Sequence, residues 1–301
     1  MTNQPPIGLS ILIPAYNYVC VNLVKGLQKQ AQQLGISYEI IVADDGSTAK
    51  QAIKINRGIA NIPNCTYIER EENAGRAAIR NFLAEQSKYA WLLFLDCDMQ
   101  LPDGLFLKRY MSNATDDIDV IDGGISIGGD HKVLSNNIRY LYEHRAEPKH
   151  TARERGKRPY KSFRTTNYMV RRKVALAYPF DQRFRHYGYE DVLFGKQLKS
   201  VGIRILHIDN PMVLTDYETN SVFIAKTEEA MRTLARFKSE LKGYSQIITA
   251  ADTLSHSHLD IVVRLWHRLM GGIERKILTG NHPWLPLFNI YRLGYYLSLT
   301  K

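Results

Sequence analysis

The chain has 301 residues with a formal net charge of +10, and 45% of its residues are hydrophobic. This length suits one large domain with an appendage or two domains, and the hydrophobic fraction is ample for a folded core. No stretch approaches the length of a membrane-spanning helix, so an integral membrane protein is not expected.

The cysteines and the N-terminus indicate where the protein works. Cys20, Cys65 and Cys97 show neither paired nor metal-type spacing, which is typical of a reducing compartment. Residues 1–6 lack the basic and apolar regions of a signal peptide. We therefore expect a cytoplasmic protein.

The positive charge is concentrated in one part of the chain. Residues 131–173 contain thirteen Lys and Arg against three Glu, an excess equal to that of the whole chain. Nucleic acid, an anionic membrane surface or a phosphorylated substrate would each complement such a region.

The first hundred residues alternate between strand-like and helix-like segments. Continuous apolar runs predict buried strands, and apolar residues at helical spacing predict helices between them. The strands are expected at residues 9–13, 38–43, 65–69 and 91–95, and the helices at 20–34, 53–59 and from about 76. This alternation favours βαβ units with a parallel sheet.

The second half of the chain is less regular. We expect a helix starting at Pro102, a strand over 119–127, a helix over 134–144, a mobile charged loop over 150–161, a strand over 163–171, a helix from Glu190 to Gly202 and a strand over 203–208. Long helical patterns follow Pro211. The prediction is thus an α/β fold with a mostly parallel, doubly wound sheet over residues 1–215 and a helical C-terminal extension over 216–301.

Acidic side chains follow the predicted strands where those strands end. Asp96 and Asp98 come directly after the run 91–95, and an extended backbone points both carboxylates the same way. Such a pair suits Mg2+ or Mn2+ at the sheet edge where ligands bind, although an Asp-rich turn is equally consistent with it. Asp44–Asp45 and Glu190–Asp191 are two further acidic pairs, and three clusters on one edge favour a metal–phosphate site with arginines nearby.

Five segments in this order resemble the family 2 glycosyltransferases, which have the A-type nucleotide-diphospho-sugar transferase fold. The segments are 11–17, 39–47, 73–81, 94–98 and 187–191, and the resemblance extends over residues 9 to about 210. It implies an inverting, metal-dependent enzyme. Such an enzyme moves a sugar from a nucleotide-diphospho-sugar, commonly a UDP-sugar, to a hydroxyl of a glycan or lipid-linked acceptor.

The resemblance also implies roles for individual residues. Pro14 and Tyr16 would line the nucleotide pocket, and Asp45 would accept a hydrogen bond from the base. Asp98 would bind Mn2+ or Mg2+ on the diphosphate, while Asp191 would be the general base with Glu190 beside it. The remaining expected substrate-binding residues are Asn73, Arg76, Arg80, Asp96, Asn167 and Gly188.

Several of these residues have a structural alternative. Arg80 is equally consistent with a solvated helix residue, and Glu190 and Asp191 with favourable charges at a helix N-terminus. Related families place a metal-binding His near position 214, where this chain has Leu214. His207 is then either a ligand or a buried structural residue, and Asp216 is a candidate third ligand.

Two other functions compete with a transferase. A protein that binds a nucleotide sugar or a nucleic acid without transfer would also use basic residues. Acidic clusters at strand ends would repel nucleic-acid phosphates, so we expect no nucleic-acid partner. The sequence does not identify the donor sugar, the acceptor or the oligomeric state.

Two segments outside the motifs suggest further contacts. The basic loop 145–164 is expected to order over a bound donor or an anionic acceptor. Apolar residues from Leu259 to Ile277 recur at helical spacing beside Arg264, Arg268, Arg275 and Lys276. Such a helix either packs on the domain or a second subunit, which we favour because the stripe suits a core, or lies on the inner face of the membrane.

Overall fold

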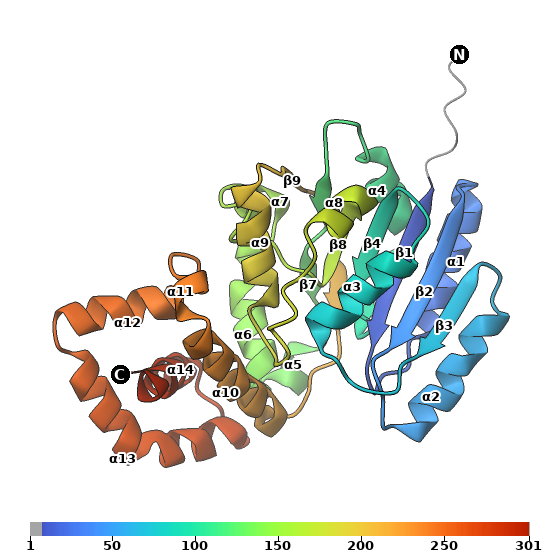
Figure 1. Cartoon of the computed structure of the whole chain (residues 1–301). Helices are drawn as coiled ribbons and strands as arrows, with labels where there is room; N and C mark the ends of the chain where they lie inside the picture. The colour runs from blue at the N-terminus through green and yellow to red at the C-terminus, as the bar shows by residue number, and fades with distance from the viewer. Residues whose placement is uncertain (1–7, 301) are drawn as a thin grey trace.

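Seven strands form one sheet in the computed structural model of the chain, which describes residues 8–300 (Figure 1). Their order across the sheet is β3 (Cys65–Glu69), β2 (Tyr38–Asp44), β1 (Leu9–Ala15), β4 (Trp91–Leu95), β8 (Asn167–Arg171), β6 (Val120–Asp122) and β9 (Ile205–His207). All neighbours pair in parallel except β8, which runs antiparallel to both β4 and β6. The expected mostly parallel sheet is confirmed; residues 1–6, where a signal peptide was not expected, lie outside the described residues.

Helices cover both faces of this sheet because its central strands are apolar on both sides. In β4, Trp91, Leu93 and Leu95 pack on one face with α1 (Val21–Leu34) and α4 (Phe106–Ser112). Leu92 and Phe94 pack on the other face with α3 (Arg76–Gln86), α8 (Arg172–Ala177) and α9 (Glu190–Ser200). The doubly wound architecture expected from the apolar runs is therefore present.

The predicted strand over 119–127 is divided between two sheets. Its first part is β6, and its second part, β7 (Ile125–Ile127), pairs with β10 (Met212–Leu214) in a small sheet that also contains β5 (Met99–Gln100). The break falls at Gly123–Gly124, where Gly124 has a φ of +77° and a Cβ on Gly123 would lie 2.4 Å from the Tyr110 hydroxyl. Apolar periodicity does not reveal such a tight crossing.

Three predicted helices also differ from expectation. The helix expected from Pro102 begins at Phe106, because the Asp103 side chain accepts the N–H of Leu105 and holds the preceding turn. The helix expected over 134–144 is divided into α5 (His131–Leu134) and α6 (Ile138–Ala146). The helix expected over 53–59 is α2 (Lys50–Asn56) followed by a 3-10 turn over Arg57–Asn61, and a second 3-10 turn covers Glu147–Lys149.

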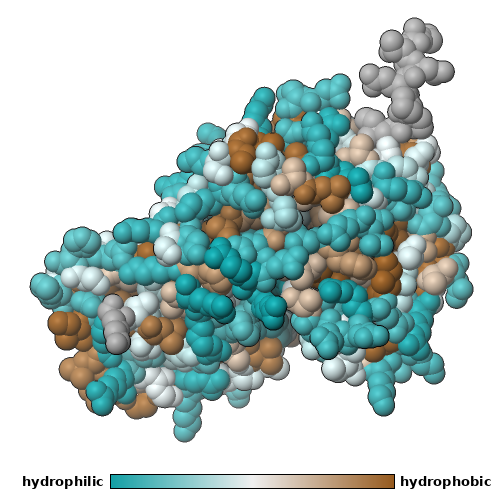
Figure 2. Space-filling view, viewed as in Figure 1, coloured by the Kyte–Doolittle hydropathy of each residue, from teal (hydrophilic) through white to brown (hydrophobic). Residues whose placement is uncertain are grey.

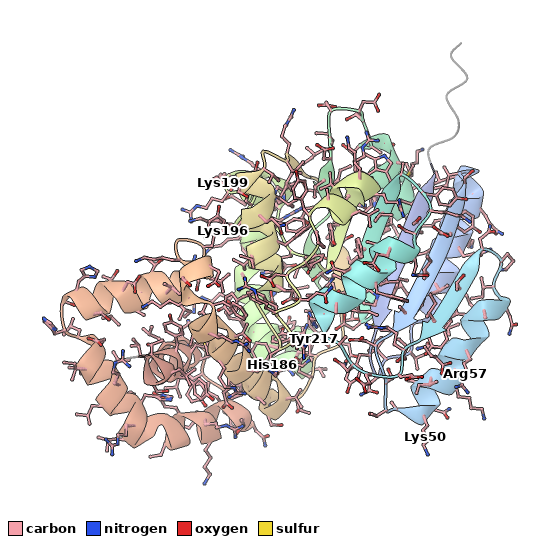
Figure 3. The ribbon with its side chains drawn as sticks, viewed as in Figure 1. Lys50, Arg57, His186, Lys196, Lys199 and Tyr217 are labelled. Atoms are coloured by element: carbon pink, nitrogen blue, oxygen red, sulfur yellow. The ribbon has the colours of Figure 1, made fainter. Side chains whose placement is uncertain are left out.

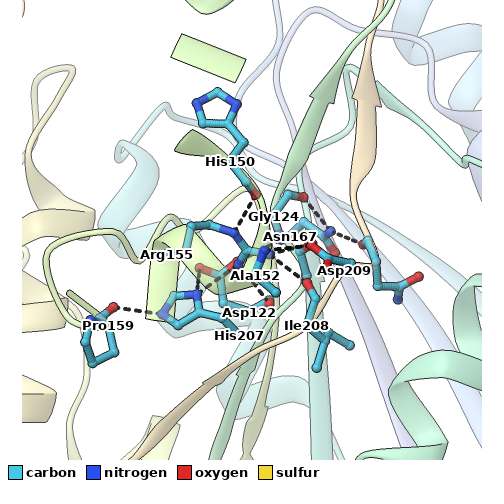
Figure 4. Close-up of polar contacts among 12 residues, drawn as sticks. Asp122, Gly124, His150, Ala152, Arg155, Pro159, Asn167, His207, Ile208 and Asp209 are labelled. Carbon is cyan, nitrogen blue, oxygen red and sulfur yellow. Dashed lines mark hydrogen bonds and ion pairs between the residues drawn. The ribbon is translucent and has the colours of Figure 1, made fainter. Parts of the chain in front are cut away.

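The charged segment 150–161, expected to be a loop with nothing to bury, contains the short helix α7 (Ala152–Gly156) and a buried arginine (Figure 4). The Arg155 side chain is 5% exposed and lies 3.0 Å from the Asp122 carboxylate. It also donates to the backbone carbonyls of His150 and Ile208 and contacts Nδ1 of His207. Burial of this one cation against β6 and β9 fixes the segment.

His207 belongs to the same network. Its side chain is 1% exposed, and its ring lies between the Asp122 carboxylate and the carbonyl of Pro159. Of the two alternatives open from the sequence, the structure favours the buried structural histidine.

The helices after residue 215 pack on one another and on the sheet domain. They are α10 (Asn220–Arg236), α11 (Lys238–Leu241), α12 (Gln246–His256), α13 (Asp260–Thr279) and α14 (Leu285–Leu299), with α14 inside the ring that the others form (Figure 1). Phe184 and the segment around Tyr187 share an apolar cluster with α10 and α14. None of the helices within residues 8–300 combines the length and hydropathy needed to cross a bilayer.

We expect Arg155→Met to leave the Asp122 carboxylate buried without its counter-charge, lowering the free energy of unfolding by about 3–5 kcal/mol. Backbone amides of residues 150–161 should then exchange with deuterium faster. The matched control is Arg153→Met on the same helix, whose side chain is exposed. Chemical unfolding and hydrogen exchange check both variants; equal stability of the two would show that Arg155 does not hold the segment.

Candidate active site

A cavity of about 470 Å³ opens at the carboxyl edge of the parallel strands. This volume is within the range of small-molecule sites. Because β1, β2 and β4 run in parallel, the loops that follow them meet at this edge. Eight residues expected to bind substrate or metal line the cavity together: Pro14, Tyr16, Asp45, Asn73, Arg76, Arg80, Asp96 and Asp98.

The other four expected residues lie outside its lining. Asn167 is 1% exposed; its amide donates to the carbonyls of Gly124 and Asn210 and accepts from the Tyr110 hydroxyl. It therefore ties the two sheets together, and nothing of it is free for a substrate. Gly188 contributes a backbone turn, with a φ of +99° next to Tyr189 at +70°, and Glu190 and Asp191 begin α9.

Asp45 organises the loop that leads into α3. Its carboxylate accepts the N–H groups of Ala74 (3.2 Å) and Gly75 (2.9 Å) and a hydrogen bond from Arg70 (2.9 Å). Burial raises the pKa of Asp45, and these donors oppose the rise. Gly75 has a φ of +89°, and a Cβ there would lie 2.7 Å from the carbonyl oxygen of Arg185. The turn into α3 thus requires glycine.

Arg80 lies beneath the cavity between two carboxylates. Its Nη2 donates to Oδ1 of Asp96 at 2.8 Å, and its Nη1 lies 3.5 Å from Oε1 of Glu190. The Arg80 side chain is 1% exposed, so it is not a solvated helix residue. It joins the acid after β4 to the first acid of α9.

Asp98 differs from Asp96 in its surroundings. Burial, and then the neighbouring charge of Asp96, raise the pKa of Asp98, while Arg76 and Arg139 oppose the rise. The Arg76 guanidinium stacks over the Tyr187 ring at 4.9 Å. The floor of the cavity therefore holds two close carboxylates beneath cationic side chains, a distribution that suits a cation and a diphosphate together.

Glu190 and Asp191 also differ from each other. Glu190 is buried and paired with Arg80, whereas within the described part of the chain Asp191 forms no ion pair. Burial and the neighbouring carboxylate of Glu190 raise the pKa of Asp191 to about 6, against the effect of Arg164 and Arg80. The Asp191 carboxylate accepts the N–H of Val192 at 2.7 Å. Asp191 is thus the acid of the pair suited to exchange a proton near neutral pH.

The sequence motifs missed one wall of the cavity. Arg139 on α6 and Lys226 on α10 line it and both pair with Glu218, Lys226 at 3.1 Å. His186, labelled in Figure 3, lies 3.3 Å from Glu229 at the same side. The only sequence signal was the basic composition around Arg139, since helix packing alone brings α10 to the sheet edge.

The residues present are compatible with a hard divalent cation. Asp98 offers carboxylate oxygens, and the like charge of Asp96 opposes ionisation of Asp98 when no cation is bound. Asp216 also lines the cavity, and burial followed by the Asp216 carboxylate raises the pKa of the Tyr18 hydroxyl to about 12. Leu214 is buried in β10. Within residues 8–300 no three His, Cys, Asp or Glu side chains are grouped as a preformed metal site.

Comparison with known proteins gives a family match. The model of the family described as Glycosyl transferase family 2 matches residues 10–178. The chondroitin synthase of Escherichia coli is 31% identical over 132 residues, 43% of this chain and 18% of that protein. The chondroitin synthase of Pasteurella multocida (strain Pm70) is 27% identical over 243 residues, 68% of this chain and 24% of that protein. The chain thus spans about a quarter or less of these relatives.

Solved structures share the fold at low sequence identity. A mannosyltransferase from Pyrobaculum calidifontis in complex with GDP-Man and Mn2+ has a TM-score of 0.58 at 13% identity, covering 99% of this chain and 86% of that one. TarS from S. aureus in complex with UDP-GlcNAc has a TM-score of 0.53 at 17% identity, covering 97% and 90%. These matches extend over the C-terminal helices as well as the sheet.

We expect Arg80→Met to destabilise the protein by about 3–5 kcal/mol, because it leaves Asp96 and Glu190 close together without their shared cation. Arg57→Met is the matched control: Arg57 pairs with Glu69 at the exposed edge beside α2 (Figure 3), and its loss should change stability little. Chemical unfolding measures both; a loss at Arg80 no larger than that at Arg57 would contradict the bridging role.

Proposed function

The chain belongs to glycosyl transferase family 2 and is a glycosyltransferase, and we propose that it transfers a sugar from a UDP-sugar to a hydroxyl of a glycan or lipid-linked acceptor with inversion. The observation that carries the proposal is the cavity that brings Asp45, Arg76, Asp96 and Asp98 together at the carboxyl edge of the sheet. The UDP-GlcNAc complex of a protein with the same fold supports a UDP-sugar donor, and the relatives named chondroitin synthase support a glycan acceptor.

We assign the donor to the cavity as follows. Pro14, Tyr16 and Asp45 flank the nucleotide, with Asp45 also holding the turn at Gly75. Arg76 faces the diphosphate together with Arg139 and Lys226, which can exchange Glu218 for phosphate oxygens. One carboxylate oxygen of Asp96 keeps its hydrogen bond from Arg80, and the other oxygen faces the ribose or the donor sugar.

Asp98 is the proposed ligand of Mn2+ or Mg2+, with Asp216 as a second candidate. When bound, the cation would neutralise charge on the leaving nucleoside diphosphate. Protein sites for Mg2+ often supply one or two carboxylates and leave the remaining positions to substrate phosphates, which matches this donor set. The Mn2+ in the mannosyltransferase complex supports a divalent ion.

Asp191 is the proposed general base. The acceptor oxygen attacks the anomeric carbon while the bond from that carbon to the diphosphate oxygen breaks, and the hydroxyl proton passes to the Asp191 carboxylate. A single displacement inverts the anomeric centre. Glu190 keeps its ion pair with Arg80, and this pair holds the start of α9 next to the proposed donor site.

The basic region does not favour nucleic acid as the partner. Its arginines have separate tasks: Arg155 is buried on Asp122, Arg139 lines the cavity and Arg164 pairs with Glu143. They do not combine into one surface that could follow a phosphate backbone. Ordering of the segment 145–164 over a bound donor stays a prediction. Because Arg155 is held on Asp122, we expect movement only in the rest of that segment.

The proposal is tested by thermal unfolding with UDP- and GDP-sugars in the presence and absence of Mn2+ or Mg2+. We expect a UDP-sugar to raise the unfolding temperature only with metal, and Asp98→Ala to abolish that metal-dependent rise. Asp116→Ala, which removes a fully exposed acid far from the cavity, should behave as the parent. Undiminished metal-dependent binding by Asp98→Ala would remove Asp98 from the site.

Asp191→Asn should reduce sugar transfer by several orders of magnitude while nucleotide binding is kept, because the amide has the same shape but accepts no proton. Since burial and Glu190 raise the pKa of Asp191 to about 6, transfer by the parent should fall as the pH drops through about 6 and protonates the base. Initial rates across pH measure this. If turnover of the variant stays within about tenfold, ~1.4 kcal/mol in the barrier, the base is another group.

A further inference from the structure

Helix α13 leaves one apolar face uncovered. The three most exposed apolar side chains on it are Leu269 at 69%, Val262 at 62% and Ile261 at 61%. The face, which we call the α13 stripe, comprises Leu259, Ile261, Val262, Leu265, Trp266, Leu269, Ile273 and Ile277. Figure 2 shows apolar side chains gathered at the lower left, over the C-terminal helices. Contiguous apolar surface of this kind marks an interaction site.

The stripe is not needed for packing within the chain. The opposite side of α13, with the buried Gly271, Glu274 and Leu278, faces α10 and α14. His267 on that side packs against Gly294 of α14, where a Cβ would lie 2.8 Å from the His267 side chain. Val263 of the predicted stripe does pack against the C-terminal core. The expectation of packing on the domain fails for the exposed residues of the α13 stripe, and packing on a second subunit stays a prediction.

The charges of α13 are sorted between its two sides. Glu274 is 2% exposed and accepts the indole N–H of Trp266 at 2.8 Å, and Asp260 pairs with Arg264 at 3.2 Å. Of the two acids of the helix, Glu274 is therefore buried and Asp260 is neutralised by Arg264. Arg268 and Lys276 are exposed beside the stripe, and among the described residues neither has an acidic partner within ion-pair distance.

We propose that the α13 stripe binds the surface of a membrane that contains anionic lipid. Its twenty residues form a rod about 30 Å long. Apolar side chains lie along one side, with Arg268 at the edge of that side and Lys276 near its C-terminal end, the pattern of a helix that lies in the interface plane. Trp266 and Trp284, 49% and 60% exposed, offer the amphipathic rings that favour the headgroup level. This proposal does not depend on the identity of the donor or the acceptor.

A second copy of the chain fits this face less well. A two-fold contact between two α13 stripes would bring Arg268 and Lys276 of both copies to one interface without acids to compensate them. The net charge of +10 also makes two copies of the chain repel each other. An anionic surface complements both the cations and the apolar side chains.

The test is flotation of the full-length protein with phosphatidylcholine vesicles, with and without phosphatidylglycerol. We expect the parent to float with the anionic vesicles and to be released by high salt. The pair Leu265→Ser and Leu269→Ser together should reduce the bound fraction at least about tenfold, and so should Arg268→Glu with Lys276→Glu. Because Trp91 is 1% exposed, a blue shift of tryptophan emission on binding would report Trp266 and Trp284.

Leu105→Ser is the matched control, since Leu105 is an apolar side chain 54% exposed on α4's side of the sheet domain. It should float as the parent, and all variants should keep the parent's unfolding temperature because the replaced groups are exposed. A parent left wholly in the soluble fraction overturns the proposal. So does a concentration-dependent dimer, without vesicle binding, that Leu269→Ser abolishes, which would assign the stripe to a second copy.

Discussion

The candidate site depends on one buried cation. Arg80 is the fifth residue of α3. Its guanidinium contacts Asp96, which follows β4, and Glu190, which begins α9. A guanidinium keeps its charge when it is buried and offers several donors in one plane, so it can serve two carboxylates at once. Without it, the two acids would repel each other in a region that excludes water. The separation between Asp96, next to the proposed metal ligand, and Glu190, next to the proposed base, is therefore set by the span of one arginine.

The second constraint is the turn that precedes α9. Gly188 and Tyr189 both have positive φ, and a Cβ on Gly188 would lie 2.9 Å from Cβ of Ala230 on α10. Tyr187, just before this turn, stacks beneath Arg76, and Thr233 of α10 donates to the Tyr187 carbonyl. Contacts with α10 thus fix the turn, and α9 begins at a position where Glu190 forms its ion pair with Arg80. The extension is part of the scaffold of the site.

The sequence predicted those parts that follow from local pattern and parallel topology. Continuous apolar runs located β1 to β4, and the rule that parallel strands end at one edge brought Asp45, Asp96 and Asp98 together. Asn167 was misjudged because an amide in a strand looks the same in sequence whether it binds a ligand or joins two sheets. Arg155 was misjudged because burial of a charge depends on partners such as Asp122 and His207, which lie far away in the chain. Arg139 and Lys226 reach the cavity only because their helices pack at the sheet edge, and helix packing produces no sequence motif.

The wall formed by Arg139, Glu218 and Lys226 has a consequence for how this enzyme could diversify. Lys226 and Glu218 lie beyond residues 10–178, the part that matches the family model. Arg139 lies within the matched part, so this wall of the cavity joins residues from the family region and from the C-terminal helices. Substitutions in α10 would reshape the side of the cavity lined by Lys226 and Glu229 without changing the strand-end carboxylates. A chimera that exchanges only residues 216–301 would keep the strand-end residues of the cavity and replace Asp216, Glu218, Lys226 and Glu229, so recombination at a single junction would alter one wall of the proposed donor site.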